Sequence, residues 1–102
     1  GSAGAEAQYL LAEHDHNAGA FDACEEKLFV LIEQFYNQDV WKNKGFLLLV
    51  KTYIGMNDLF QARATANSIL ANVQVAEVQE AVSDLLLEID ALEAATTEPN
   101  QE

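Results

Sequence analysis

Apolar residues recur along this chain every three to four positions, in five segments separated by short polar stretches. This spacing is typical of α-helices with one buried face, so we expect helices over residues 5–17, 20–36, 39–55, 59–72 and 75–94. The apolar positions of the first helix are Ala7, Leu10, Leu11 and Ala18. Those of the second are Phe21, Cys24, Leu28, Leu31, Ile32 and Phe35, and those of the fifth are Val75, Val78, Val82, Leu85, Leu86, Ile89 and Leu92.

Residues that favour helix ends stand between the apolar segments. Gly19 is expected to end the first helix, because glycine adopts the left-handed conformation of a helix C-terminus without a steric penalty. Asn57 is expected to help end the third helix. Asp39 is predicted as the N-cap of the third helix, and Asp58, with Gln61 three residues later, resembles a capping box at the start of the fourth.

The first two helices and the next two follow the same pattern, with an offset of 38 residues. Each copy consists of an apolar helical segment, a tight turn and a second segment with a small residue four places in. The matched positions are Leu11-Ala12 with Leu49-Val50, Gly19 with Asn57, Phe21 with Leu59, Cys24 with Ala62, and Leu31-Ile32 with Ile69-Leu70. A repeat of this length predicts helical hairpins that stack, because neither can bury its apolar face alone.

These positions resemble the tetratricopeptide repeat (TPR). The first copy supplies the motif through Tyr9, Leu11, Ala12, Gly19, Phe21 and Cys24, and the second through Phe46, Leu49, Val50, Tyr53, Asn57, Leu59 and Ala62. The resemblance implies a right-handed α-solenoid in one domain, residues 5–94. Two TPR-like hairpins, residues 5–36 and 39–72, would be followed by a capping helix over 75–94. It also suggests the C-terminal repeats of a bacterial TPR protein.

The chain departs from the TPR pattern in three places. The offset of 38 exceeds the usual period of about 34 residues, which suggests a longer second helix or a wider linker. Val50 replaces the expected small residue. Asp15 stands where the second copy has Tyr53, so we expect its half-buried carboxylate to pair with a neighbouring histidine or with Lys27. Outside the repeats, residues 1–4 are expected to be flexible and a cloning remnant, and residues 95–102 a disordered tail.

Composition and charge exclude several classes of function. The chain has 17 acidic and five basic residues and a formal charge of −12, which argues against binding to nucleic acid. No apolar run is long enough to span a bilayer, so no membrane insertion by this segment is expected. Cys24 is the only cysteine and forms no internal disulfide. Localisation stays open between the cytoplasm and the bacterial cell envelope or periplasm.

Only residues 13–16, Glu-His-Asp-His, invite a chemical interpretation. His14 and His16 point about 200° apart on a helix and cannot share one metal ion. Glu13 and His16 share a face, but a di-iron site needs a second such element, and the chain has no other histidine. Cys24 lies on an apolar face and is expected to be a core thiol. We therefore expect no catalytic residue, no metal site, no cofactor and no enzymatic activity.

Binding to a protein or peptide is the function that the resemblance implies. In TPR arrays the first helices of the repeats line a concave face that receives a ligand. Carried over to this chain, that face comprises Glu6, Tyr9, Leu10, Glu13 and Asn17 from the first helix and Lys44, Leu47, Leu48 and Lys51 from the third.

Two alternatives stay open for this face. Glu6 and Glu13 match Lys44 and Lys51 across the 38-residue offset, so the charges could form two ion pairs between the repeats. Otherwise Lys44 and Lys51 would anchor an acidic ligand. A second function is self-association, in which Tyr9 and Leu10 pair with an identical chain to form a homodimer. Trp41 and Phe46 are expected to pack at the seam between the repeats. Binding of an acidic chaperone tail is disfavoured, because Glu13 and Lys51 occupy the positions where such a clamp carries asparagine.

Overall fold

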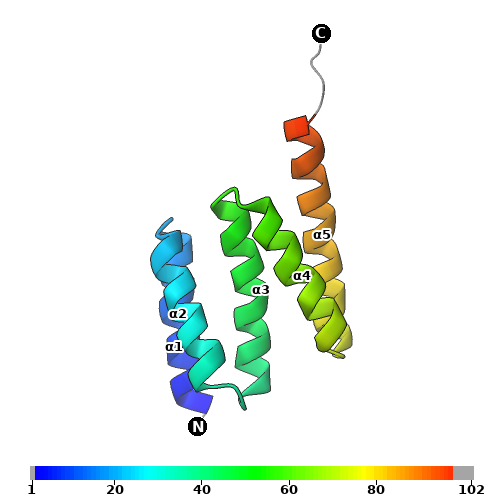
Figure 1. Ribbon diagram of the computed structural model, residues 1–102. Coiled ribbons are helices and arrows are strands. Elements are labelled where there is room, and N and C mark those ends of the chain that lie inside the picture. Colours follow the sequence, from blue (N-terminus) through cyan, green and yellow to red (C-terminus); the bar gives the residue numbers. More distant parts are fainter. Residues whose placement is uncertain (1, 98–102) are drawn as a thin grey trace.

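A computed structural model of the protein describes residues 2–97, and these form five α-helices with no strand. The helices are α1 (Ser2–Asn17), α2 (Phe21–Gln34), α3 (Asp39–Gly55), α4 (Leu59–Asn72) and α5 (Ala76–Thr97) (Figure 1). The prediction of an all-α chain with five helices is confirmed. The bounds of α3 and α4 agree with the predicted segments, whereas α1 and α5 are longer than expected. Residues 2–4 and 95–97, predicted to be flexible or disordered, are helical. Residues 1 and 98–102 lie outside the described part.

The turns after α1 and α3 have the same hydrogen bonds. Gly19 has a φ of 79°, its N–H donates to the carbonyl of His16, and the next N–H, of Ala20, donates to the carbonyl of Asp15. Asn57 has a φ of 59°, and the same two bonds recur 38 residues later. Both turns are Schellman motifs, in which a left-handed residue lets the chain reverse while satisfying the last carbonyl groups of the helix.

The starts of the helices differ more from the predictions. The Asp58 carboxylate accepts a hydrogen bond of 3.1 Å from the backbone N–H of Gln61, which confirms the predicted N-cap of α4. Asp39 is not an N-cap: Gln38 occupies that position without a side-chain bond, and Asp39 is the first residue of α3. An acidic residue in the first turn still interacts favourably with the helix dipole. Asp39 therefore does mark the start of α3, although the helix begins one residue earlier than predicted from an N-cap at this position.

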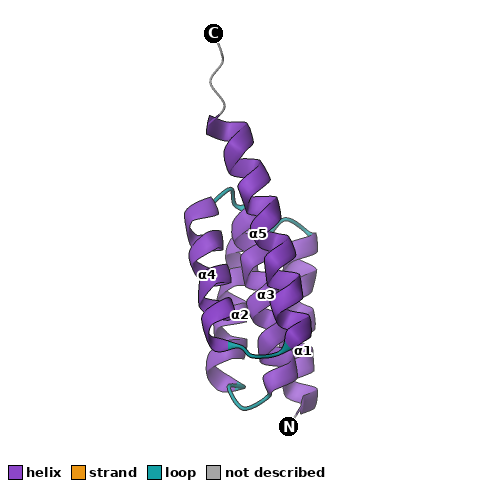
Figure 2. Ribbon diagram, turned by 90° about the vertical axis from the view of Figure 1, so that its right-hand side faces the viewer, coloured by secondary structure: helices purple, strands orange, loops and turns teal. Residues whose placement is uncertain are grey.

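The helices pack as a row in chain order. Each helix contacts the next one along the chain, α1 also contacts α3, and α3 also contacts α5, whereas α1 and α5 make no contact within the described residues. The result is an elongated molecule with extents of 56 × 30 × 16 Å. In Figure 1 the α1–α2 pair, the α3–α4 pair and α5 lie side by side, and Figure 2 shows the short loops that join them.

A continuous apolar core runs between the pairs. The predicted apolar face of α2 is confirmed, with Cys24, Leu28 and Leu31 fully buried. The face of α5 is confirmed at Val78, Val82, Leu85 and Ile89, whereas Val75 and Leu92, at the two ends, are exposed. Small residues at the contacts allow the helices to approach closely: Ala12, Ala62 and Ala66 are fully buried, and a methyl group of Leu31 would lie only 2.7 Å from a Cβ placed on Gly45.

The apolar face predicted for α1 is not buried. Ala7, Leu10, Leu11 and Ala18 are all exposed, and the residues of α1 that enter the core are Ala5 and Ala12, with Tyr9 partly buried against it. Alanine-rich α1 has apolar residues on two sides, and only one of them meets another helix. The spacing identified an apolar stripe correctly but placed the core on the wrong side of the helix.

Candidate interaction surface

The residues predicted to bind a partner lie on α1 and α3, which pack against each other. Leu48 is only 5% exposed and belongs to the core, so its assignment to the binding face was wrong. Its place in the repeat explains the burial, since α3 is covered by helices on both sides. The remaining predicted residues are at least partly exposed: Glu6, Tyr9, Leu10, Glu13 and Asn17 on α1, and Lys44, Leu47 and Lys51 on α3.

At one end of this face, Tyr9, Trp41 and Lys44 form a stacked group. The rings of Tyr9 and Trp41 lie 5.6 Å apart at an angle of 48°, and the Lys44 ammonium lies 5.1 Å from the Trp41 ring centroid. Trp41 therefore packs at the seam between the repeats, as predicted. Burial and the nearby Glu13 carboxylate raise the pKa of Tyr9. The Lys44 ammonium, by contrast, interacts with the face of the Trp41 ring and not with a carboxylate.

Of the two alternatives for the charges of this face, the ion pairs between the repeats do not form among the described residues. Neither Glu6 with Lys44 nor Glu13 with Lys51 forms an ion pair in the described part of the chain. Matching positions in two repeats point in the same direction from their helices. Their side chains can form an ion pair only where the two helices are close enough for the charged groups to meet. The Asp15 carboxylate instead forms an ion pair of 2.5 Å with Lys27 of α2, one of the partners predicted for it.

A small polar cluster of Thr52, His16 and Cys24 joins α3, α1 and α2. The Thr52 hydroxyl donates to the Leu48 carbonyl at 2.7 Å, so its single proton is already used. The Thr52 oxygen also lies 3.0 Å from His16 Nδ1 and 3.4 Å from Cys24 Sγ. Both of these groups must therefore donate to it, which places a proton on Nδ1 of His16.

The electrostatics of this cluster favour neutral side chains. Burial lowers the pKa of His16, and the Lys51 charge lowers it further. Burial raises the pKa of the Cys24 thiol, which is fully buried. A thiol that is both buried and protonated is a poor nucleophile, which confirms Cys24 as a core residue. In the described residues, no group of three or more histidine, cysteine or acidic side chains is arranged to hold a metal ion.

A groove follows the seam between α3 and α5. Three adjoining hollows of about 300, 260 and 290 Å³ share lining residues, Leu47 joining the first two and Lys51 with Leu85 joining the last two. We call this the α3–α5 groove. Its remaining lining residues are Asp39, Val40, Asn43, Lys44, Ile54 and Gly55 from α3, Val78, Ala81, Asp84, Glu77 and Glu88 from α5, Val75 just before α5, His16 of α1, and Phe21 of α2.

The two edges of the α3–α5 groove differ in charge. Lys44 and Lys51 are exposed along α3, where the one lining carboxylate, Asp39, forms an ion pair with Lys42. Glu77, Asp84 and Glu88 are exposed along α5. The floor between the edges is apolar, and it includes Leu47 with the mostly buried Val78 and Leu85. Within the described residues neither Lys44 nor Lys51 has an ion-pair partner, although the Lys44 ammonium lies near the Trp41 ring.

Sequence reasoning found only the α3 edge of this groove. It treated the fifth helix as a cap and therefore missed Glu77, Ala81, Asp84 and Glu88. A signal was present, because Glu77, Asp84 and Glu88 recur every four to seven residues beside an apolar stripe. Because α5 contacts α3, it offers that side to the same groove.

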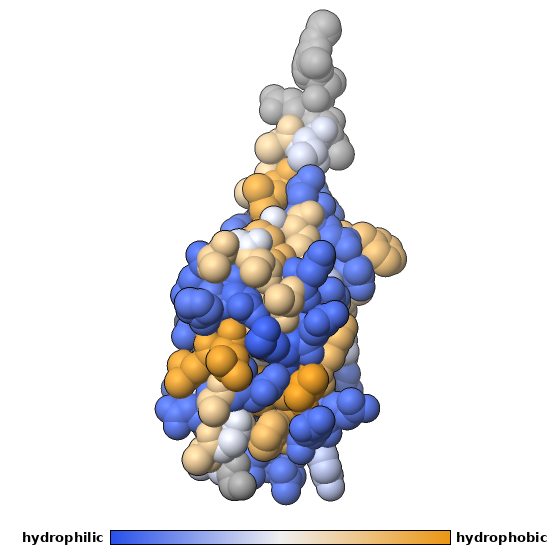
Figure 3. Space-filling view, turned by 90° about the vertical axis from the view of Figure 1, so that its left-hand side faces the viewer, coloured by the Kyte–Doolittle hydropathy of each residue, from blue (hydrophilic) through white to orange (hydrophobic). Residues whose placement is uncertain are grey.

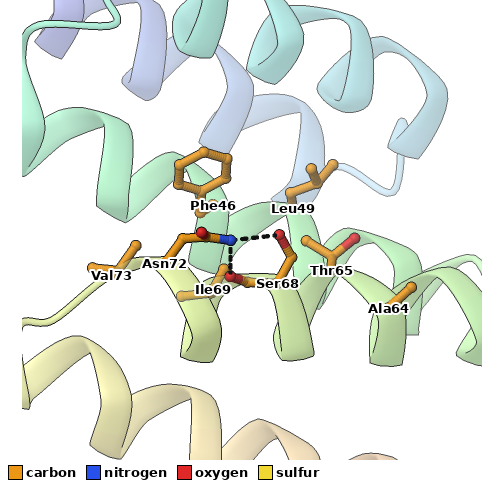
Figure 4. A pocket seen from close by; sticks show the side chains of 8 residues that line it. All are labelled: Phe46, Leu49, Ala64, Thr65, Ser68, Ile69, Asn72 and Val73. Atoms are coloured by element: carbon orange, nitrogen blue, oxygen red, sulfur yellow. Dashed lines mark hydrogen bonds between the residues drawn. The ribbon is translucent and has the colours of Figure 1, made fainter.

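A further hollow of about 340 Å³ lies between α3 and α4 (Figure 4). Phe46 and Leu49 line it from α3, and Ser68, Ile69 and Asn72 are among the α4 residues on its other side. The Asn72 amide is already occupied, since it donates to the Ser68 carbonyl at 2.8 Å and lies 3.4 Å from the Ser68 hydroxyl. No acidic or basic side chain lines this hollow, so it offers neither a charged anchor nor an acid–base group.

Comparisons with known proteins give no relative for this chain. No protein-family model matches it, and neither curated proteins nor solved structures show a significant match. None of the described helices has the length and apolar content that are needed to cross a membrane.

Proposed function

We propose that this chain is a protein-interaction module that binds a peptide segment of a partner in the α3–α5 groove. The observation that carries the proposal is the groove itself, an apolar floor between a basic and an acidic edge, exposed over much of the length of two helices. Such a surface suits recognition of a chain segment better than chemistry on a small molecule, because it is open and elongated.

We further propose that the helices form a right-handed α-solenoid of two TPR-like hairpins and a last helix. The contacts of α1 with α3 and of α3 with α5 support this arrangement, because the first helices of successive repeats are neighbours in such arrays. The matching Schellman turns at Gly19 and Asn57 support it as well. In this arrangement the α3–α5 groove is the counterpart of the peptide-binding concave face.

The charges of the groove define the ligand's chemistry. Its apolar side chains would cover Leu47 and Leu85, an acidic group would face Lys44 and Lys51, and basic groups would face the carboxylates of α5. An uncharged apolar peptide would leave both edges without partners. A strongly basic peptide would be attracted by the net charge of −12 but would meet Lys44 and Lys51 on one side.

A displayed library of random 12-residue peptides tests the proposal. Peptides enriched on the immobilised chain are synthesised, and their affinities are measured by fluorescence anisotropy. We expect Lys51→Glu to weaken binding by about fivefold, since it removes an attraction and adds a repulsion. The double variant Gln34→Glu with Asn67→Glu is the matched control: it changes the net charge equally, at two exposed positions on α2 and α4 that do not line the groove, and should leave the affinity unchanged.

Three results would contradict the proposal. The library could yield no peptide that binds at micromolar concentration, although the chain is folded. The double variant Gln34→Glu with Asn67→Glu could weaken binding as much as Lys51→Glu, which would show a general effect of charge. The enriched peptides could also bind with the same affinity after Lys44→Glu and Lys51→Glu are combined.

A further inference from the structure

The outer side of α1 is an apolar helix face that no helix covers within the described part of the chain. It consists of four residues, Ala7, Leu10, Leu11 and His14, all of them exposed. Their counterparts 38 residues later, Gly45, Leu48, Leu49 and Thr52, are all buried. Leu10 and Leu11 are 50% and 54% exposed, whereas Leu48 and Leu49 are each 5% exposed. The two helices thus present the same face, and only the one on α3 is covered.

Helix α2 covers the α3 face at two of its four positions. Its Leu31 side chain lies so close to Gly45 that an added Cβ would be 2.7 Å from the leucine methyl group, and its Cys24 Sγ lies 3.4 Å from the Thr52 hydroxyl. The covering element is therefore a helix with aliphatic side chains on the contact side. Figure 3 shows the corresponding α1 end of the molecule, where hydrophobic patches lie among hydrophilic residues at the surface.

We infer that this outer face of α1 binds an amphipathic helix of a partner protein, with aliphatic side chains on one side and lysine or arginine residues along its margins. The apolar part of the inference follows from the correspondence with the α2–α3 contact. Because the counterpart of this face is filled by a helix of the same chain, the geometry of the contact is already present once in the molecule.

The charged part follows from the charges of α1 and α2, the two helices at this end of the row. Lys27 is the only lysine or arginine of α1 and α2, and its ammonium is paired with Asp15. Exposed carboxylates remain at Glu6 on α1 and at Glu26 and Glu33 on α2. A second copy of this chain would bring the same negative groups together, whereas a helix with basic margins would neutralise them. Charge therefore favours a different partner over self-association.

One residue also limits the shape of the partner. Ala7 stands where α3 has Gly45, so its Cβ occupies the space into which the Leu31 methyl group reaches in the α2–α3 contact. The partner side chain opposite Ala7 must therefore be shorter than leucine. We expect valine or alanine there, flanked by larger aliphatic residues that meet Leu10 and Leu11.

A peptide made from α2 itself serves as the probe. It carries residues 20–36 with Leu31→Val to fit Ala7, Cys24→Ala to prevent oxidation, and Asp22→Lys, Glu26→Lys and Glu33→Lys to supply basic margins. A control peptide keeps the three acidic residues. We expect saturable binding of the basic probe in fluorescence anisotropy, and binding of the control at least about fivefold weaker.

Variants of the protein locate the binding. Leu11→Ser should weaken the basic probe by about tenfold, because the contact of one leucine is lost. Leu87→Ser is the matched control, since Leu87 is 66% exposed on α5 and far from α1 along the row. Leu87→Ser should leave the affinity for the basic probe unchanged. Lys51→Glu should leave it unchanged as well, and that result would show that the probe does not bind in the α3–α5 groove.

Three outcomes would overturn the inference. The basic probe could fail to bind, or bind as tightly to Leu11→Ser as to the original chain. The acidic control could bind as well as the basic probe, which would remove the argument from charge. Light scattering could also show a dimer of this chain that Leu11→Ser dissociates, in which case a second copy is the occupant.

Discussion

At the scale of single residues, Thr52 organises the contact between the first three helices. Its hydroxyl accepts from His16 of α1 and Cys24 of α2 while donating to its own helix. Thr52 is the only polar residue among the buried residues that the structure describes. A buried hydroxyl is costly unless it is hydrogen-bonded, and here all of its bonding capacity is used.

Replacing the hydroxyl tests this account. We predict that Thr52→Val destabilises the chain by about 1–2 kcal/mol, because the shape is kept while His16 and Cys24 lose their acceptor. Urea unfolding followed by circular dichroism measures the change. Thr65→Val is the control, since Thr65 is partly buried on α4 and its side chain makes no hydrogen bond to any described residue; it should stay within about 0.5 kcal/mol. A Thr52→Val chain as stable as the original would contradict the account.

At the scale of helices, the two hairpins end alike but begin differently. Gly19 and Asn57 close α1 and α3 with the same hydrogen bonds. Before α4, Asp58 caps the helix through the N–H of Gln61, whereas Ala20 holds the same place before α2 and has no side chain to cap it. The backbone angles of the two residues nearly agree, with φ and ψ of −86° and 68° for Ala20 and −100° and 76° for Asp58.

The missing cap can therefore be added. We predict that Ala20→Asp stabilises the chain by about 0.5–1 kcal/mol, because the new carboxylate can accept from the N–H groups at the start of α2. The reciprocal change, Asp58→Ala, should cost about 1 kcal/mol. Thermal unfolding of both variants measures the effects. Repulsion from Asp22 would reduce the gain, so the measurement is made at 0.2 M salt as well; a loss of stability at both salt concentrations would contradict the prediction.

The helices were predictable where local residues decide them. Gly19, Asn57 and Asp58 act within a few residues of their own position, so the ends that they form could be predicted from the sequence. The buried side of α1 could not, because apolar spacing identifies a stripe but not the helix that covers it. The pairing of Glu13 with Lys51 failed for the same reason, since side-chain contact depends on the distance between helices. The α5 edge of the groove was missed because it requires knowing that α5 stacks on α3.

At the scale of the whole molecule, the row of helices has two different ends. In the middle, α3 is covered by neighbours on both sides, and its residues Leu48, Leu49 and Val50 are all buried. At one end α1 is covered on one side only. At the other end Arg63 of α4 ties α5 down through ion pairs with Asp90 and Glu93, at 2.5 and 2.6 Å. Leu87 remains 66% exposed on that helix. Neighbouring helices thus share the buried surface, and the contacts of α3 with α1 and α2 join the two hairpins.

The same substitution at two equivalent positions tests the contact between α2 and α3. We predict that Gly45→Val destabilises the chain by about 1–3 kcal/mol, because the new side chain must displace buried Leu31 and push α2 away from α3. Ala7→Val introduces the same residue at the matching position of α1, where the side chain is exposed, and should change stability by less than about 0.5 kcal/mol.

Urea unfolding followed by circular dichroism compares the two variants, and Trp41 fluorescence reports on the contact between the repeats. In Gly45→Val the fluorescence transition should move to lower urea at least as far as the loss of helix, since Trp41 stacks on Tyr9 across the seam. Equal destabilisation by the two variants would show that both faces are already covered in solution. That result would contradict the separation of a filled face on α3 from an open one on α1.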